Sequence, residues 1–200
     1  MTALKTTSLI ELLTRLDTAL DHPVELCVVG GAALLLLQSD RSTPDIDVLD
    51  TLSPLDRVSV LMAARKAGLD VDQGSLDLMD GPYLQFLAPF SIRLPPHEPA
   101  TGRWPDGNLS VALWEGRCLR VVCPPYGILA ASKLIRGSDA DLQDVAFMIA
   151  HDLVDAKAIK MAGNQYSFID REDIQGNLQL IELILQHRPE PAAPKMRMVI

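Results

Sequence analysis

The sequence predicts an α/β (α+β) protein in which a small mixed sheet is flanked by helices and followed by a C-terminal helical region. Three patterns support this fold class: an apolar, β-branched run at residues 24–29, a polar–apolar alternation at residues 45–48, and helical spacing of apolar residues after position 124. We expect a core over residues 1–123, a helical region packed on it over residues 124–188, and a flexible, proline-rich tail over residues 189–200.

The first expected element is an amphipathic helix over residues 8–20. Ser8 is its expected N-cap because Glu11 follows at the spacing of a capping box. The predicted buried stripe consists of Leu9, Leu12, Leu13, Leu16 and Leu20. A further amphipathic helix is expected to begin at Ser53, which can cap it, and to stop at Gly68.

Residues 69–123 predict a strand-rich half with many loops. Short apolar runs at residues 84–87, 111–114 and 119–122 are the expected strands. Proline and glycine break the pattern over residues 94–108, a segment that is either a lid, a partner-binding loop or an ordinary connection.

The C-terminal part predicts four helices, over residues 126–135, 140–150, 155–162 and 171–187. In the last of them, apolar residues recur at helical spacing: Ile174, Leu178, Ile181 and Leu185. Such a stripe is typical of core packing or of an oligomer interface, so a homodimer or a protein partner is open at this point.

Two aspartates share one face of the strand expected at residues 45–48. Side chains alternate along a strand, so Asp45 and Asp47 point the same way while Ile46 and Val48 enter the core. Paired carboxylates suit Mg²⁺, or Mn²⁺ in its place, together with substrate phosphates. The alternative is an ordinary exposed strand face.

A glycine pair separates the first expected strand from a short helix over residues 31–38. Gly30 and Gly31 allow a ligand to approach the backbone closely. The first amides of a helix lack intrahelical partners, so this junction is an expected cradle for phosphate groups.

The glycine pair followed by the two aspartates resembles the signature of the DNA polymerase β-like nucleotidyltransferase superfamily. Arg41 and Thr43 narrow the resemblance, because they complete an R-x-T-x-D-[IL]-D pattern found in bacterial nucleotidyltransferase-like proteins. A lysine-bearing helix and a later Asp-x-x-Asp helix, with Lys133 and Asp144, extend the similarity over about residues 24–150. Related proteins include the nucleotidyltransferase toxins of type IV toxin–antitoxin systems.

The resemblance implies transfer of a nucleoside monophosphate from a nucleoside triphosphate to a hydroxyl group of RNA, protein or a small molecule. It implies that Asp45 and Asp47 are catalytic and hold Mg²⁺ or Mn²⁺. The residues that it assigns to nucleotide binding are Gly30, Gly31, Arg41, Thr43, Lys133 and Asp144. A toxin-like role with an antitoxin-like partner also follows from the resemblance alone.

The chain departs from the family pattern in two ways. Gly31 stands where the family usually has serine, and no expected neighbouring strand contains the third carboxylate of active members. Acids that flank the strands are Asp77, Asp80 and Glu115, while a second Asp-x-Asp pair, Asp70 and Asp72, lacks a preceding glycine turn. The alternative function is therefore a catalytically weak or inactive nucleotide-binding or regulatory protein that keeps the fold.

Lys133 and Asp144 each have two interpretations. Lys133 either contacts the triphosphate or is a surface lysine whose ammonium reaches outward from an apolar stem. Asp144 either orients a cation of the site or forms an ordinary salt bridge between helices.

The composition gives no sign of a dedicated nucleic-acid binder. The formal net charge is −8, so no overall field attracts polyanions, and aromatic residues are few. The arginines of the middle segment are expected on strand edges or as a local basic surface: Arg93, Arg103, Arg117 and Arg120.

The remaining patterns favour a cytoplasmic protein without zinc. The three cysteines, Cys27, Cys118 and Cys123, lie in apolar runs and are expected as buried, reduced core residues, and no cysteine or histidine spacing fits a zinc site. The N-terminus lacks the pattern of a signal peptide, and no apolar run is long enough to cross a membrane.

Overall fold

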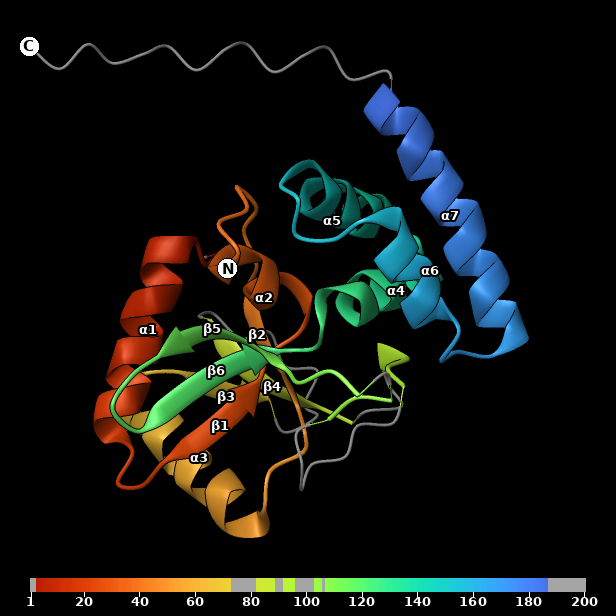
Figure 1. Cartoon of the computed structure of the whole chain (residues 1–200). Helices are drawn as coiled ribbons and strands as arrows, with labels where there is room; N and C mark the ends of the chain where they lie inside the picture. Colours follow the sequence, from red (N-terminus) through yellow and green to blue (C-terminus); the bar gives the residue numbers. More distant parts are fainter. Residues whose placement is uncertain (1–2, 73–81, 89–91, 96–102, 106, 187–200) are drawn as a thin grey trace, which may run out of the picture.

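The computed structural model describes residues 3–72, 82–88, 92–95, 103–105 and 107–186. Helices and a mixed sheet alternate through the first part of the chain, and helices alone form the last part (Figure 1). The expected α/β class is therefore confirmed. The proposed tail, Asp77 and Asp80, and most of the segment 94–108 lie outside the described residues.

Within the described residues, six strands form two three-stranded sheets that a short bridge joins. Their bounds are β1 (Val24–Cys27), β2 (Asp45–Leu49), β3 (Asp70–Asp72), β4 (Tyr83–Leu87), β5 (Val111–Glu115) and β6 (Leu119–Cys123). One sheet has the order β1-β6-β5 and the other the order β2-β4-β3. Because Val28 pairs with Val48 in an antiparallel bridge, the strands follow one another as β5-β6-β1-β2-β4-β3.

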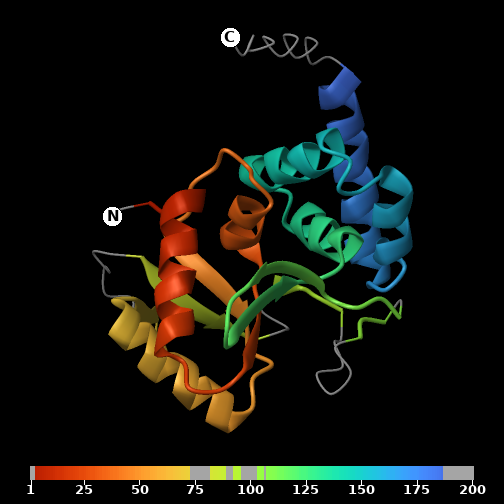
Figure 2. The same cartoon turned by 60° about the vertical axis from the view of Figure 1, so that its left-hand side comes forward.

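Two helices, α1 (Thr6–Ala19) and α3 (Pro54–Ala67), lie side by side against the sheet (Figures 1 and 2). All five leucines predicted for the buried stripe of the first helix are buried. Ser53 and Gly68 bound α3 as expected: the Ser53 hydroxyl accepts a hydrogen bond from the Asp56 amide at 3.2 Å, and Gly68 has a φ of +78°.

The predicted start of the first helix is wrong. Its N-cap is Lys5, and the Ser8 hydroxyl accepts a hydrogen bond from the Lys5 amide at 3.0 Å. The helix begins earlier because the preceding residue, Leu4, is held by a backbone pair with Thr43, in which the Leu4 amide donates to the Thr43 carbonyl at 2.7 Å. Local sequence carries no sign of this long-range contact.

Four helices follow the sheet and pack on one another: α4 (Tyr126–Arg136), α5 (Asp139–Ala150), α6 (Ala156–Gly163) and α7 (Phe168–Gln186). They gather beside the sheet, on the side away from α3 (Figures 1 and 2). Ile174, Leu178 and Ile181 of α7 are buried, which confirms a core role for most of the predicted stripe. No described helix is long and apolar enough to cross a membrane.

The topology brings several chain segments to one edge of the sheet. β1 and β6 are parallel, so their carboxyl ends lie together, and these ends lead into α2 (Gly30–Leu36) and α4. β2 runs the opposite way and therefore begins at the same edge, where the Val29 amide donates to the Asp47 carbonyl at 2.9 Å. The glycine pair, the two aspartates and the start of the helical region consequently meet.

Candidate functional site

A cleft of about 420 Å³ opens at this edge of the sheet. It lies between β2, α2 and the α4–α5 pair. The lining residues are Gly30, Gly31, Arg41, Thr43, Pro44, Asp45, Asp47, Lys133, Arg136, Ser138, Ala140 and Asp141. Seven of the eight residues predicted for the site thus line one cleft, and the eighth, Asp144, binds two of its cations.

The two aspartates of β2 alternate with buried residues as predicted. Ile46 and Val48 have no exposed surface, whereas Asp45 and Asp47 are partly exposed to the cleft. The Thr43 hydroxyl donates a hydrogen bond of 2.5 Å to the Oδ1 of Asp45. One carboxylate is therefore oriented by a neighbouring hydroxyl, and both face the same space.

Burial and, second to it, the charge of Asp45 raise the pKa of Asp47 from 3.8 to about 6. Arg136, Lys133 and Arg41 oppose this shift. Two like charges held together in a half-buried place are unfavourable without a cation. A divalent cation bound between Asp45 and Asp47 would therefore replace the proton on Asp47.

The glycines of the pair leave room for the acids and for Thr43. Gly30 has a φ of +61°, and a Cβ there would lie 2.1 Å from the Oδ2 of Asp47. A Cβ on Gly31 would lie 2.6 Å from the Oγ1 and 2.7 Å from the Cβ of Thr43. The Thr43 side chain therefore occupies the space that a serine at position 31 would need, which gives a physical reason for the glycine there.

Cations lie opposite the carboxylates and are held by a second set of acids. Lys133 is only 2% exposed, and its Nζ lies 2.7 Å from the Oδ2 of Asp144 and 3.6 Å from the Oδ1 of Asp141. Arg41 also pairs with Asp144. The interpretation of Lys133 as a surface lysine is therefore wrong, because α5 covers its ammonium and supplies its partners.

Five of the twelve residues that line the cleft were not predicted as site residues, and three of the five form one polar group: Arg136, Ser138 and Asp141. Arg136 pairs with Asp141 at 2.5 Å, and the Ser138 hydroxyl donates to the same carboxylate at 2.7 Å. Burial acts to raise the pKa of Asp141, but these hydrogen bonds and the charge of Lys133 outweigh it and lower the pKa overall. The Ser-x-x-Asp spacing of Ser138 and Asp141 is typical of a helix start, but nothing local indicates that this start faces the cleft.

No third carboxylate stands beside the pair on a described strand. In the parallel register with β4, Asp45 lies opposite Tyr83 and Asp47 lies opposite Gln85. Within the described ranges, no three acidic, histidine or cysteine side chains lie close enough together to hold a metal ion.

The other acids considered for that role lie elsewhere. Glu115, on the outer strand β5, pairs with Arg120 at 3.1 Å, so its recruitment to the site is contradicted. Asp70 is exposed on β3, the opposite outer strand, and β4 separates it from β2. The second Asp-x-Asp pair is thus apart from the cleft.

The positions of the arginines and the burial of the cysteines agree in part with the predictions. Arg93 and Arg120 form ion pairs at the surface, and neither lines the cleft. The cysteines are free thiols; Cys27 and Cys123 are buried as predicted, but Cys118 is half-buried.

The residues of the cleft fit a magnesium–triphosphate group. Asp45 and Asp47 supply two hard oxygen donors, and Mg²⁺ usually takes its other ligands from phosphates and water. Arg41 lines the same cleft, and its buried Nε has no hydrogen-bond partner in the described part of the chain. An unsatisfied buried donor is costly unless a ligand accepts from it, so it indicates a place for an anion.

Comparisons of the chain with protein-family models, with curated proteins and with solved structures find no match. The chemistry of the cleft is therefore the basis for a functional assignment.

Proposed function

We propose that the protein is a magnesium-dependent nucleotidyltransferase, which transfers a nucleoside monophosphate from a nucleoside triphosphate to a hydroxyl acceptor and releases pyrophosphate. The observation that carries the proposal is the pairing, within one cleft, of the adjacent carboxylates Asp45 and Asp47 with the cations Arg41, Lys133 and Arg136. Phosphoryl transfer requires carboxylates that hold a metal ion and basic side chains that bind the phosphate groups.

The chain's own groups would position the nucleotide. Arg41 and Arg136 line the cleft and are partly exposed, so their guanidinium groups can bind phosphate oxygens. Lys133 is buried between Asp141 and Asp144, which fixes its ammonium as a positive charge in the wall of the cleft. Thr43 orients Asp45 through its hydroxyl.

Asp45 and Asp47 would hold Mg²⁺, which when bound neutralises the phosphate charge that develops during transfer. Because both carboxylates must be ionised for this role, metal binding displaces the proton that Asp47 holds below about pH 6. Position and electrostatic stabilisation supply most of the catalysis in this class of reaction.

A second candidate is a nucleotide-binding protein of weak or absent transfer activity. The observation that favours it is the register of β4, which places Tyr83 and Gln85, and no acid, beside the two aspartates. Such a protein would bind the nucleotide with the same groups but would lack a carboxylate to accept the proton of the attacking hydroxyl.

The two candidates are separated by an assay of label transfer. The protein is incubated with each α-labelled nucleoside triphosphate, Mg²⁺, and either total RNA or protein extract. Transfer of label and release of pyrophosphate are expected for the wild type and not for Asp45→Asn or Asp47→Asn. Asp70→Asn is the matched control, because it removes an exposed acid of the second Asp-x-Asp pair far from the cleft.

Magnesium-dependent nucleotide binding without transfer supports the second candidate. Absence of both binding and transfer contradicts both.

A further inference from the structure

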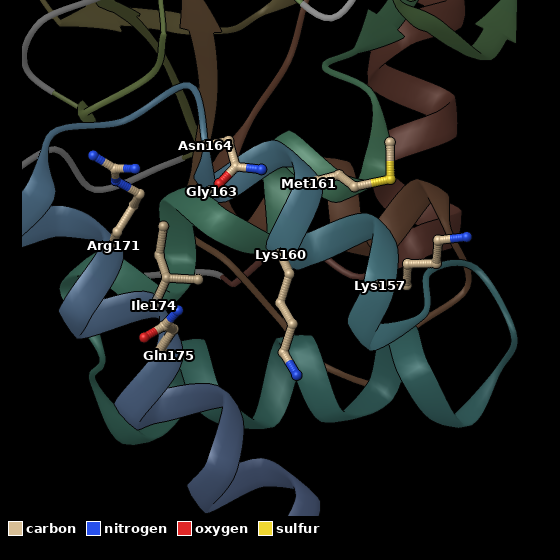
Figure 3. Close-up of a pocket in the computed structure, with 8 residues that line it drawn as sticks. All are labelled: Lys157, Lys160, Met161, Gly163, Asn164, Arg171, Ile174 and Gln175. Atoms are coloured by element: carbon tan, nitrogen blue, oxygen red, sulfur yellow. The ribbon is translucent and has the colours of Figure 1, made fainter.

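A second groove, separate from the cleft, lies between α6 and α7 and has a volume of about 340 Å³ (Figure 3). Three of its lining side chains are cationic: Lys157 and Lys160 come from α6, and Arg171 comes from α7. None of the lining residues in the described part of the chain is acidic. This is unexpected in a protein whose net charge is −8.

The three cations are exposed, and no carboxylate in the described ranges pairs with them. None of them forms an ion pair with a described residue, although Arg41, Lys133 and Arg136 in the cleft all do. Their charge is therefore available to a ligand. The groove is a local basic surface of a kind that overall composition conceals.

The cations are spread along the groove and do not converge on one point. In Figure 3, Arg171 and Lys157 lie at opposite ends, and Lys160 extends between them. A compact anion such as free phosphate would be bound best by convergent donors. Spaced positive charges suit a ligand that carries negative charges at intervals along a chain.

The surface between the cations is partly apolar and partly amide. Ile174 forms a buried wall, Met161 is 60% exposed, and Asn164 and Gln175 add side-chain amides. Phe168 does not line the groove, but it lies one helical turn before Arg171, and its ring is 66% exposed. Exposed apolar and aromatic side chains beside cations are the combination on which unpaired bases stack while phosphates are neutralised.

We propose that the α6–α7 groove binds a single strand of nucleic acid, with its phosphates at Lys157, Lys160 and Arg171. An acidic peptide would satisfy the cations but would leave the exposed side chains of Met161 and Phe168 without flat partners. α4 packs against α6 and separates the groove from the cleft, so strand binding needs neither Asp45 nor Asp47. If the proposed transfer function also holds, the bound strand is a candidate acceptor.

The test is fluorescence anisotropy with a labelled single-stranded RNA of about ten nucleotides, a length within the usual site size of such proteins. No nucleoside triphosphate or Mg²⁺ is present. With three phosphate contacts, the logarithm of the association constant should fall linearly with the logarithm of the salt concentration, with a slope of about −2. The variant Lys157→Gln/Lys160→Gln/Arg171→Gln should lose at least about tenfold in affinity and most of this slope.

The matched control removes three exposed cations from α1 and α3: Arg15→Gln/Arg65→Gln/Lys66→Gln. It changes the net charge equally and should bind as the wild type does. Gly163→Ala tests the shape of the groove. Its Cβ would lie 3.6 Å from Ile174, an ordinary contact distance, and would fill part of the groove. This variant should therefore weaken binding without a change of charge.

Asp45→Asn should bind the strand as the wild type does. Strand binding and nucleotide transfer are therefore tested separately, and loss of one does not imply loss of the other. The proposal is overturned if the wild type does not bind, if both triple variants lose affinity equally, or if an acidic peptide of the same length competes as well as unlabelled RNA.

Discussion

The carboxylate of Asp47 belongs to the proposed site, and in its ionised form it lowers the stability of the folded protein. This carboxylate is partly buried beside Asp45, and both effects raise its pKa to about 6. In the unfolded chain the same group ionises near 3.8. The folded state therefore holds this proton more tightly, and the stability that the proton supports is lost as the pH rises from about 4 through about 6.

Asp47→Asn should stabilise the metal-free protein at pH 8 and leave its stability nearly unchanged at pH 4. A shift of about two pKa units corresponds to about 2 to 3 kcal/mol at high pH. Urea unfolding of both proteins between pH 4 and 8, in a chelator, measures the difference. If the variant is less stable than the wild type at pH 8, ionised Asp47 does not destabilise the folded state, which contradicts this account.

The pair of Gly31 and Thr43 is a second residue-scale feature with a direct test. Gly31→Ser alone should destabilise the protein by about 1 to 3 kcal/mol, because its Cβ would overlap the Thr43 side chain. Adding Thr43→Gly removes the atoms in the way, so the double variant should be more stable than the sum of the two single effects predicts. Additive effects in a thermodynamic cycle would argue against the overlap.

At the scale of elements, the order of segments was predictable and their long-range partners were not. The strand, glycine pair, helix and second strand appear where the alternation of Asp45 to Val48 and the glycines placed them, because these signals are local. The burial of Lys133 depends on α5 folding back over α4, and the start of α1 depends on a contact between Leu4 and the loop at Thr43. Leu4 and Thr43 lie in different segments, so no local window of sequence contains both partners of that contact. Lys133 and Asp144 are 11 residues apart, and their pairing was among the interpretations left open by the sequence, but no local pattern shows that the pairing buries the lysine.

The same limit applies to the site. Its carboxylates and glycines form one contiguous motif and could be predicted, whereas Arg136 and Asp141 enter the cleft only through the packing of α4 against α5. The groove between α6 and α7 was also not predicted, because the way these two helices pack is not visible in local sequence and because the acidic overall composition hides a local group of cations.

Helix packing in the C-terminal region gives a paired prediction. A Cβ on Gly127 of α4 would lie 2.9 Å from the backbone oxygen of Ala158 in α6, so Gly127→Ala should destabilise the protein by about 1 to 3 kcal/mol. Gly176 of α7 has no atom within 4 Å of such a position, so Gly176→Ala should stabilise by about 0.5 to 1 kcal/mol. Thermal unfolding of the two variants checks the opposite signs, and equal effects would contradict the close approach of α4 and α6.

At the scale of the whole molecule, the sheet and the helical region supply the two walls of one cleft. β2 presents carboxylates from one wall, and α4 and α5 present cations and their counter-ions from the other. Under the proposed function, a divalent cation and a triphosphate would need both walls. We expect ligand binding to stabilise the packing of the helical region on the sheet, because the ligand contacts both.

Isothermal titration calorimetry of the intact protein with nucleoside triphosphates, in the presence and absence of Mg²⁺ at pH 8, tests this arrangement most directly. Binding should require Mg²⁺ and should be lost in Asp45→Asn and Asp47→Asn, while Asp70→Asn binds as the wild type does. Binding that is absent in the wild type, or that survives loss of both cleft aspartates, would contradict the assignment of the cleft as a magnesium–nucleotide site.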